Sequence, residues 1–284
     1  MNELIFPLEV NYIAVFLTLR CNLNCSYCIN KHSDFVAPQE LSLDDWVIGL
    51  SRIVTRPDLP ISLQGGEPTI YNSFYKLANI LHFQHKHLDL LTNGMFDLRE
   101  FCKEITPDVF KRNAKYASIR FSYHHKMSPV ALIMKVWTLQ NAGYEVGIWG
   151  LDNNVQNNAV KNLCTQLNID FREKEFLAKG IGTYKYNNAV GQATGKKVWC
   201  KTSELLIGPS GHIFRCHADL YANRDWIGHI LEPEIKFSDF RECNHYGQCN
   251  PCDVKLKTNR LQEYGHCSVE IKGRGVESYG RKTV

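Results

Sequence analysis

Short apolar runs alternate with segments of helical periodicity from residue 11 to about residue 175. Runs such as "YIAVFLTL" and "EVGIWGL" are rich in β-branched and aromatic residues, which is typical of strands. Between the runs, apolar residues recur three and four positions apart, as they do on one face of a helix. About six strand–helix units follow one another, and this alternation predicts an α/β fold with a parallel sheet.

The pattern places each expected element on a defined stretch of the chain. We expect strands at 12–19, 61–64, 87–92, 117–123, 145–151 and 169–176. We expect helices at 41–54, 71–83, 98–105, 129–142 and 160–167. Ser42 and Asp45 have the spacing of a capping box at the start of the first helix. Ser128 as cap, Pro129 in the first turn and Gly143 past the end delimit the fourth helix.

The amino-acid composition changes beyond residue 176, where the alternation of strand and helix patterns ends. The stretch "AKGIGTYKYNNAVGQATGKK" is rich in glycine, asparagine and lysine and reads as a linker. After it, "LLI" and "HIFR" flank the turn residues "GPSG", which predicts a β-hairpin. We therefore expect two domains, at residues 1–180 and 181–284.

The composition and the N-terminal sequence indicate the class of protein and its cellular compartment. The 284 residues are 44% hydrophobic and 22% charged, with a formal net charge of +4, which is typical of a globular protein. The N-terminus lacks the basic start and apolar stretch of a secretory signal, and no run of residues is long and apolar enough to span a bilayer. We expect a cytoplasmic protein that binds no membrane, and nucleic acid is not an expected partner.

Three of the eleven cysteines lie close together in "TLRCNLNCSYC", directly after the first expected strand. Cys21, Cys25 and Cys28 fall at the edge of the sheet where the chemistry of a parallel barrel collects. A structural zinc site needs four ligands, and His32 is the nearby residue that could supply the fourth. A 4Fe–4S cluster held by three thiolates instead leaves one iron open to a ligand.

These residues resemble the hallmark of the radical S-adenosylmethionine (SAM) enzymes, C-x3-C-x-aromatic-C, with Tyr27 in the aromatic position. The resemblance implies a partial (β/α)6 TIM-like barrel, a 4Fe–4S cluster and bound SAM. In this family the open iron chelates SAM, and one electron cleaves SAM to methionine and a 5′-deoxyadenosyl radical. The radical takes a hydrogen atom from substrate, and a reductase or flavodoxin is the expected electron donor.

Further segments resemble the cofactor site of the family. In "QGGEPT" two glycines permit close backbone approach and a carboxylate can pair with the methionine ammonium group. The positions that the resemblance assigns to SAM are Tyr27, Gly65, Gly66, Glu67, Asn93, Ser122 and Leu151. Tyr123, His124 and His125 follow the fourth strand and could face substrate, although histidines there are as often merely solvated.

A second cysteine group follows the linker. The spacing from Cys200 through Gly211 to Cys216 resembles the twitch and SPASM auxiliary-cluster domains of the same family. The later cysteines depart from the full SPASM pattern, so the resemblance favours one auxiliary 4Fe–4S cluster in a small domain with a hairpin and a helix. The expected ligands are Cys200, Cys216, Cys249 and Cys252, with Cys243 as the rival. Zinc is the alternative, because His212, His217 and His245 lie in the same segment.

The remaining cysteines have other expected roles. Cys164 lies on an apolar helical face and Cys102 in a weak helix, so both are expected to be core thiols. Cys243 or Cys267, if it binds no cluster, could return a hydrogen atom to a substrate radical.

The resemblance predicts an enzyme of the oxidoreductase or epimerase type. Its expected substrate is a small molecule or natural-product intermediate, such as a sugar or aminocyclitol, which is dehydrogenated or epimerised. Two alternatives stay open. One is the modification of a ribosomally made peptide, disfavoured because no leader-recognition segment precedes the first strand. The other is a non-enzymatic zinc or iron–sulfur protein.

Overall fold

The structure is a computed structural model of the 284-residue chain. It describes residues 3–6, 10, 12–25, 28, 39–112, 114, 116–124, 127–151, 157–174, 196–202, 204–233, 235, 240–246 and 269–272. Within these ranges the side chains of some strand residues, Leu151, Cys200 and Cys243 among them, are outside the description.

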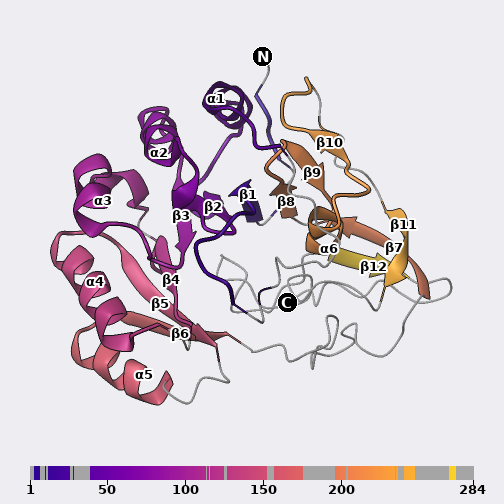
Figure 1. The fold of residues 1–284 in the computed structure, drawn as a ribbon. Coiled ribbons are helices and arrows are strands. Elements are labelled where there is room, and N and C mark those ends of the chain that lie inside the picture. The colour runs from indigo at the N-terminus through magenta and orange to yellow at the C-terminus, as the bar shows by residue number, and fades with distance from the viewer. Residues whose placement is uncertain are drawn as a thin grey trace.

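A parallel sheet forms the centre of the molecule (Figure 1). Its strands are β1 (Tyr12–Thr18), β2 (Ile61–Gly65), β3 (Leu88–Thr92), β4 (Ile119–Ser122), β5 (Val146–Leu151) and β6 (Asp170–Lys174). Each strand pairs in parallel with the next one along the chain. The sheet curves without closing, so the partial (β/α)6 barrel expected from the sequence is confirmed.

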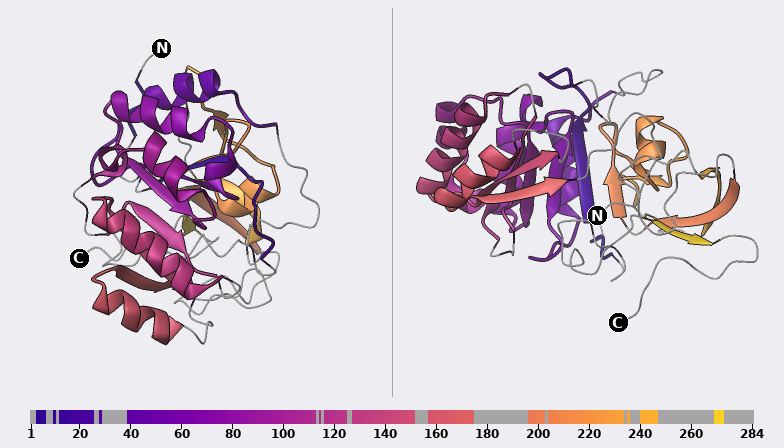
Figure 2. Two further views of the ribbon diagram at one scale, coloured as in Figure 1. Left: turned by 60° about the vertical axis from the view of Figure 1, so that its left-hand side comes forward. Right: turned by 90° about the horizontal axis from the view of Figure 1, so that it is seen from below.

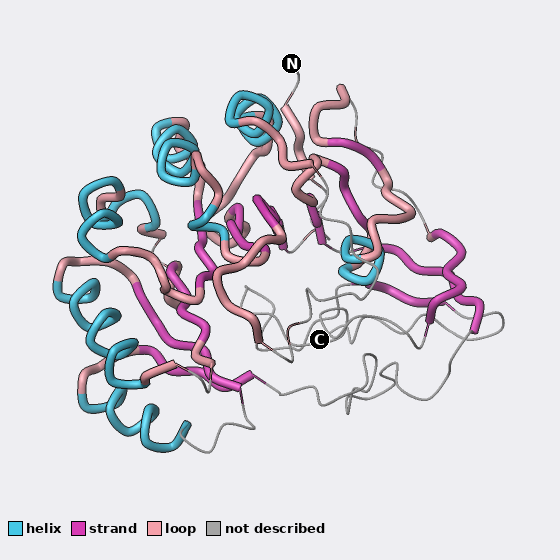
Figure 3. Tube along the Cα trace, viewed as in Figure 1, coloured by secondary structure: helices cyan, strands magenta, loops and turns pink. Residues whose placement is uncertain are grey.

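Helices cover the convex side of this sheet (Figure 3). They are α1 (Leu43–Ser51), α2 (Phe74–Phe83), α3 (Leu98–Glu104), α4 (Pro129–Asn141) and α5 (Asn157–Gln166), with short 3-10 helices η1 (Pro68–Ile70) and η2 (Pro107–Phe110). The expected caps are confirmed: the Asp45 amide donates to the Ser42 hydroxyl at 3.1 Å, and the Ala131 amide donates to the Ser128 hydroxyl at 3.4 Å. Gly143 follows α4 with a φ of +92°, which favours glycine.

Alternate residues of β1 enter two different apolar clusters. Ile13, Val15 and Leu17 pack with the helices in the main core. Ala14 and Phe16 face the concave side and pack in a smaller cluster with residues of the C-terminal half. This period of two is the geometry of a strand buried on both faces.

The hairpin beyond the linker joins the same sheet. β8 (Glu204–Ile207) pairs in parallel with β1, with Leu205 opposite Ile13, and β9 (His212–Phe214) returns antiparallel to β8. β10 (Gly228–His229) adds the last strand, so the sheet has the order β10-β9-β8-β1-β2-β3-β4-β5-β6. The hairpin predicted around "GPSG" is thereby confirmed, while the domain boundary at residues 180 and 181 stays a prediction.

A second sheet of three strands lies beyond the hairpin (Figure 2). β7 (Lys196–Thr202) is its central strand, flanked antiparallel by β11 (Arg241–Tyr246) and β12 (Val269–Lys272). The short helix α6 (His217–Tyr221) follows β9. The expected linker falls on residues outside the description, except for Lys196 and Lys197, which begin β7.

No helix in the described part of the chain is long and apolar enough to cross a membrane.

Candidate functional site

The three clustered cysteines lie in the loop that leaves the carboxyl end of β1. Cys21 is exposed, and Cys25 and Cys28 are half-buried. The Cys28 amide donates to the Cys25 carbonyl at 3.2 Å. The described His, Cys, Asp and Glu side chains include no group of three that is close enough to hold a metal ion. The three thiols therefore lie in one loop but are not close enough together to bind a metal ion as they stand. Tyr27 and His32 are outside the description.

Gly65 and Gly66 bring the end of β2 against this loop. The Gly66 amide donates to the Thr18 carbonyl at 2.8 Å, and the Glu67 amide donates to the Arg20 carbonyl at 2.9 Å. A Cβ on Gly66 would lie 1.9 Å from the Arg20 carbonyl oxygen, and Gly65 has a φ of +144°. Only glycine permits this approach, so the "GGE" segment and the cysteine loop form one unit.

Glu67 is fully buried between the ends of β2 and β3. Its Oε1 accepts from the Thr69 amide (3.2 Å) and hydroxyl (2.7 Å) and from the Thr92 hydroxyl (2.7 Å), while Oε2 accepts from the Asn93 amide (2.7 Å). No basic side chain pairs with Glu67 among the described residues. Burial raises the pKa of Glu67, and these hydrogen bonds oppose the rise. Fixed hydrogen-bond donors therefore surround the Glu67 carboxylate, and no positively charged side chain of the described residues pairs with it.

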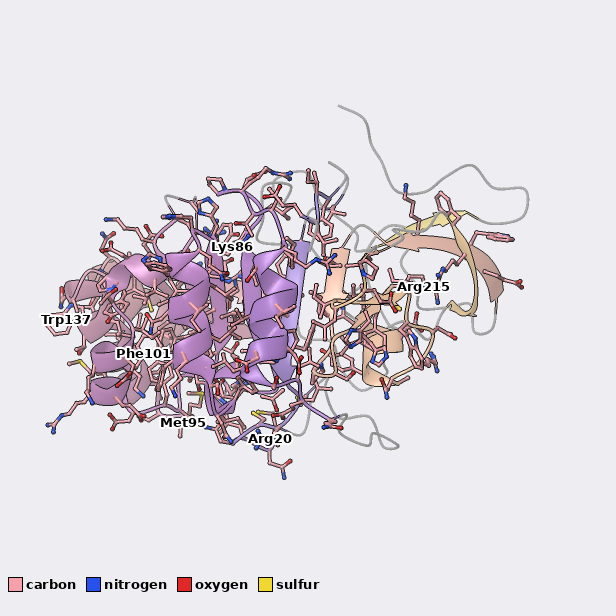
Figure 4. All side chains as sticks on the ribbon, turned by 90° about the horizontal axis from the view of Figure 1, so that it is seen from above. Arg20, Lys86, Met95, Phe101, Trp137 and Arg215 are labelled. Carbon is pink, nitrogen blue, oxygen red and sulfur yellow. The ribbon has the colours of Figure 1, made fainter. Side chains whose placement is uncertain are left out.

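Asn93 connects the end of β3 to the cysteine loop. Its Nδ2 donates to the Asn22 side chain at 2.8 Å and approaches the Cys21 sulfur at 3.6 Å, and its Oδ1 accepts from the Met95 amide. Figure 4 shows Arg20 and Met95 at one edge of the sheet and Lys86, which precedes β3, at the other. The carboxyl ends of the strands thus bring Cys21, Glu67 and Asn93 together. The contact of Asn93 with Cys21 was not anticipated from the sequence.

The strands β4 to β6 extend this edge. Ser122, at the end of β4, is half-buried opposite Trp149 of β5. Arg172 of β6 lies over the Trp149 ring, 5.5 Å from its centroid. Leu151 ends β5, and its side chain is outside the description. Contacts of Ser122 and Leu151 with SAM stay predictions.

The candidate substrate residues after β4 differ in their surroundings. Tyr123 is only 1% exposed and packs in the main core, so the structure buries a side chain that was expected at an open rim. The Tyr123 amide donates to the Trp149 carbonyl at 2.8 Å, which extends the β4–β5 ladder by one residue and turns the ring inward. His124 is half-buried, and His125 is outside the description.

A buried charge network lies at the opposite end of the sheet. Asp89 of β3 is fully buried and accepts from Arg112 Nε at 2.6 Å and from Arg120 Nη2 at 2.8 Å. Tyr116 donates to Asp89 at 3.3 Å, and burial beside this carboxylate raises the pKa of Tyr116 to about 12. The network joins β3, β4 and the segment after η2, far from the cysteine loop, so we assign it to the support of the sheet.

The second cysteine group is only partly described. Cys216 is buried at the start of α6, and Arg215 beside it donates to Asp219 at 2.8 Å and to the Glu242 carbonyl at 3.1 Å. Arg241 pairs with Cys200 across β11 and β7, which places Cys243 two residues along the same register. Cys249, Cys252, Cys267 and His245's side chain are outside the description, so the ligand set stays a prediction.

His212 and His217, two of the histidines that left zinc as an alternative, belong to no group of three potential metal ligands among the described residues. His212 Nδ1 lies 2.9 Å from the Ser210 hydroxyl, and its ring is tilted by 45° against the Trp226 ring, with the centroids 4.6 Å apart. His217 is buried against Phe16 of β1, with ring centroids 5.8 Å apart.

Two further cysteines had been expected in the core. Cys164 is fully buried on α5, which confirms the expectation. Cys102 is exposed on α3, so that expectation was wrong. In this helix Phe101 is the residue that turns into the core, and its neighbour therefore faces outward.

Residues 15–128 match the sequence family described as the radical SAM superfamily. Among curated proteins, the GTP 3′,8-cyclase of Clostridium perfringens is 24% identical over 174 residues, which are 60% of this chain and 50% of that protein. The GTP 3′,8-cyclase of Agrobacterium fabrum is 32% identical over 106 residues, 35% of this chain and 30% of that protein. The chain thus spans half or less of the length of these relatives.

Two solved structures share the fold. A structure of anSMEcpe with bound AdoMet and Kp18Cys peptide has a TM-score of 0.57 at 15% identity, over 80% of this chain and 79% of the other. Streptococcus suis SuiB bound to S-adenosylmethionine has a TM-score of 0.51 at 14% identity, over 89% and 71%. At these identities the likeness establishes the architecture alone.

Proposed function

Because residues 15–128 match the radical SAM superfamily, we propose that the chain reductively cleaves SAM and uses the resulting 5′-deoxyadenosyl radical to abstract a hydrogen atom. The proposed substrate is a small molecule or natural-product intermediate, for example a sugar or aminocyclitol. Its proposed fate is dehydrogenation or epimerisation, and a reductase or flavodoxin would supply the electron.

One observation carries this proposal: the backbone of Gly66 and Glu67 is hydrogen-bonded to the loop that carries Cys21. A loop with three thiols and a segment suited to an amino acid ligand therefore lie side by side. The donors of the chain fit both groups, since thiols suit iron and a buried carboxylate without a basic partner among the described residues suits an ammonium group.

Each set of residues has a proposed role at this edge of the sheet. Cys21, Cys25 and Cys28 would hold the cluster, and Glu67 with the glycine backbone would orient the methionine part of SAM. Further SAM contacts are proposed for Tyr27, Asn93, Ser122 and Leu151. The candidates for substrate chemistry are still Tyr123, His124 and Cys267. Of these, the structure describes Tyr123, which is buried, and His124, which is half-buried.

The later cysteines would determine the outcome of the reaction. Dehydrogenation of an alcohol removes a hydrogen atom, a proton and an electron and leaves a ketone. A closed auxiliary cluster on Cys200, Cys216, Cys249 and Cys252, with Cys243 as rival, would suit the transfer of that electron. In epimerisation a free thiol, Cys243 or Cys267, would instead return a hydrogen atom to the opposite face.

Anaerobic reconstitution tests the proposal. With dithionite and SAM, we expect about eight irons per chain and formation of 5′-deoxyadenosine. Replacement of Cys21, Cys25 and Cys28 by alanine should leave about four irons and abolish SAM cleavage. The matched control is Cys102→Ala, which removes an exposed thiol on α3 and should change neither result. Bound zinc without 5′-deoxyadenosine would contradict the proposal.

A peptide substrate is the second candidate, because anSMEcpe, which shares the fold, was crystallised with a peptide. Small-molecule and peptide pools can be compared by the deuterium that 5′-deoxyadenosine gains from each deuterated pool. Label from peptides alone would favour the second candidate.

A further inference from the structure

An ion pair and a hydroxyl group join the two ends of the cysteine loop. Arg20 donates to Glu40 through two nitrogens, Nε to Oε1 at 2.8 Å and Nη2 to Oε2 at 3.0 Å. The Thr18 hydroxyl donates to the same Oε1 and accepts from the Arg20 amide at 3.0 Å. The residues between Arg20 and Glu40 include all three cysteines of the loop. We name Thr18, Arg20 and Glu40 the clasp.

The backbone of the clasp is fixed on the side of β2. The carbonyls of Thr18 and Arg20 accept the Gly66 and Glu67 amides. Arg20 is therefore held at its side chain by Glu40 and at its carbonyl by Glu67. Cys21 follows directly, so its backbone position depends on both bonds.

The other end of the clasp is also fixed. The backbone of Leu41, next to Glu40, makes two hydrogen bonds. The Leu41 amide donates to the Pro209 carbonyl at 2.8 Å, and the Leu41 carbonyl accepts from the Tyr71 hydroxyl at 2.9 Å. Pro209 lies in the turn between β8 and β9. Glu40 is thus anchored by its backbone, unlike a carboxylate at the tip of a mobile surface loop.

The charges of the clasp are mutually stabilised. Burial raises the pKa of Glu40, but the hydrogen bonds from Arg20 and Thr18 and the guanidinium charge outweigh it and lower the pKa overall. The side chains are 52% exposed for Arg20 and 23% exposed for Glu40, whereas Thr18 is fully buried. A bidentate pair with a buried third member is better ordered than a typical surface ion pair.

We propose that Arg20 and Glu40 are positioning residues that close the cysteine loop and hold Cys21 beside Gly66 and Asn93 for cluster binding. This inference rests on the proposed function only for the identity of the bound group. Loss of either side chain should let the loop open and speed the release of iron.

A chelator challenge tests the clasp. In the reconstituted protein, Arg20→Gln and Glu40→Gln should each release the iron of the first cluster roughly three to ten times faster than wild type. The double variant should be no faster than either single variant, because the two side chains act as one pair. The matched control is Arg56→Gln, which breaks a half-exposed ion pair with Asp58 away from the loop and should leave the rate unchanged.

A second measurement separates the clasp from the proposed function. In the metal-free chain, the maleimide labelling rate of the half-buried Cys25 and Cys28 should rise in both single variants and stay constant in Arg56→Gln. If wild type binds no iron in this loop, the proposed function fails and labelling alone decides on the clasp. Iron release and labelling rates equal to wild type in both variants would overturn the inference.

Discussion

Glu67 is a carboxylate with four hydrogen bonds and no basic partner among the described residues. In Glu67→Gln the amide NH₂ must face either the Asn93 amide or the donors around Oε1, so two donors oppose each other. We expect the free energy of unfolding of the metal-free chain to fall by about 1–3 kcal/mol. Chemical denaturation measures this loss.

The control for Glu67 is Glu232→Gln, at an exposed carboxylate that accepts from the His229 amide. That substitution should change the free energy of unfolding by less than about 0.5 kcal/mol. Equal losses in the two variants would contradict the arrangement described for Glu67.

Cys164 gives a prediction of pH dependence. Burial raises the pKa of its thiol to about 11. The folded state therefore prefers the protonated thiol, and this contribution is present below the unfolded pKa of about 8.5 and is lost as the pH rises through about 11. Wild type should lose on the order of 2–3 kcal/mol of stability over this range relative to Cys164→Ala. A constant difference between the two proteins from pH 8 to pH 11 would be incompatible with this pKa.

Single residues were predictable where their chemistry is local. The three cysteines and "GGE" could be identified because close spacing and glycine chemistry are visible in the sequence. The contact between Asn93 and Cys21 joins residues 72 positions apart, so it needed the sheet. The exposure of Cys102 was missed because a short helix with one buried residue has too weak a periodicity to define its inner face.

At the scale of elements, the starts of the two helices with capping serines were predictable. Ser42 and Ser128 cap α1 and α4 by side-chain hydrogen bonds to residues three positions on, which is information within one turn. The role of Asp89 was hidden, because its partners Arg112 and Arg120 lie 23 and 31 residues further on.

The Asp89 network should stabilise the packing of β3 against β4. Asp89→Asn replaces the carboxylate that two buried guanidinium groups share with a neutral amide, and we expect a loss of about 3–5 kcal/mol in the free energy of unfolding. The control Asp58→Asn alters a half-exposed pair and should cost less than about 1 kcal/mol. Equal denaturant midpoints for the two variants would show that the buried network stabilises the fold no more than the half-exposed ion pair does.

At the scale of the molecule, the sequence predicted the parallel sheet but not the pairing of β8 with β1. Local periodicity identifies a strand and carries no information about a partner nearly two hundred residues away. The expected division at residues 180 and 181 would separate these paired strands.

Truncation tests whether residues 1–180 fold stably without the C-terminal hairpin. A fragment of residues 1–180 lacks β8, which exposes the edge of β1 and uncovers Ala14 and Phe16. We expect this fragment to be aggregation-prone and to melt at a lower temperature than the full chain. A soluble, monomeric fragment with an unchanged melting temperature would show that the sheet does not need the hairpin.

The β1–β8 pairing also has a consequence during synthesis on the ribosome. Tyr12 pairs with Glu204, so the partner of β1 is translated 204 − 12 = 192 residues later. At about 5–20 residues per second, β1 emerges roughly ten to forty seconds before β8 exists. For that interval one edge of the first strand is open to other chains, which makes the nascent protein a candidate client for chaperones that shield unpaired strands.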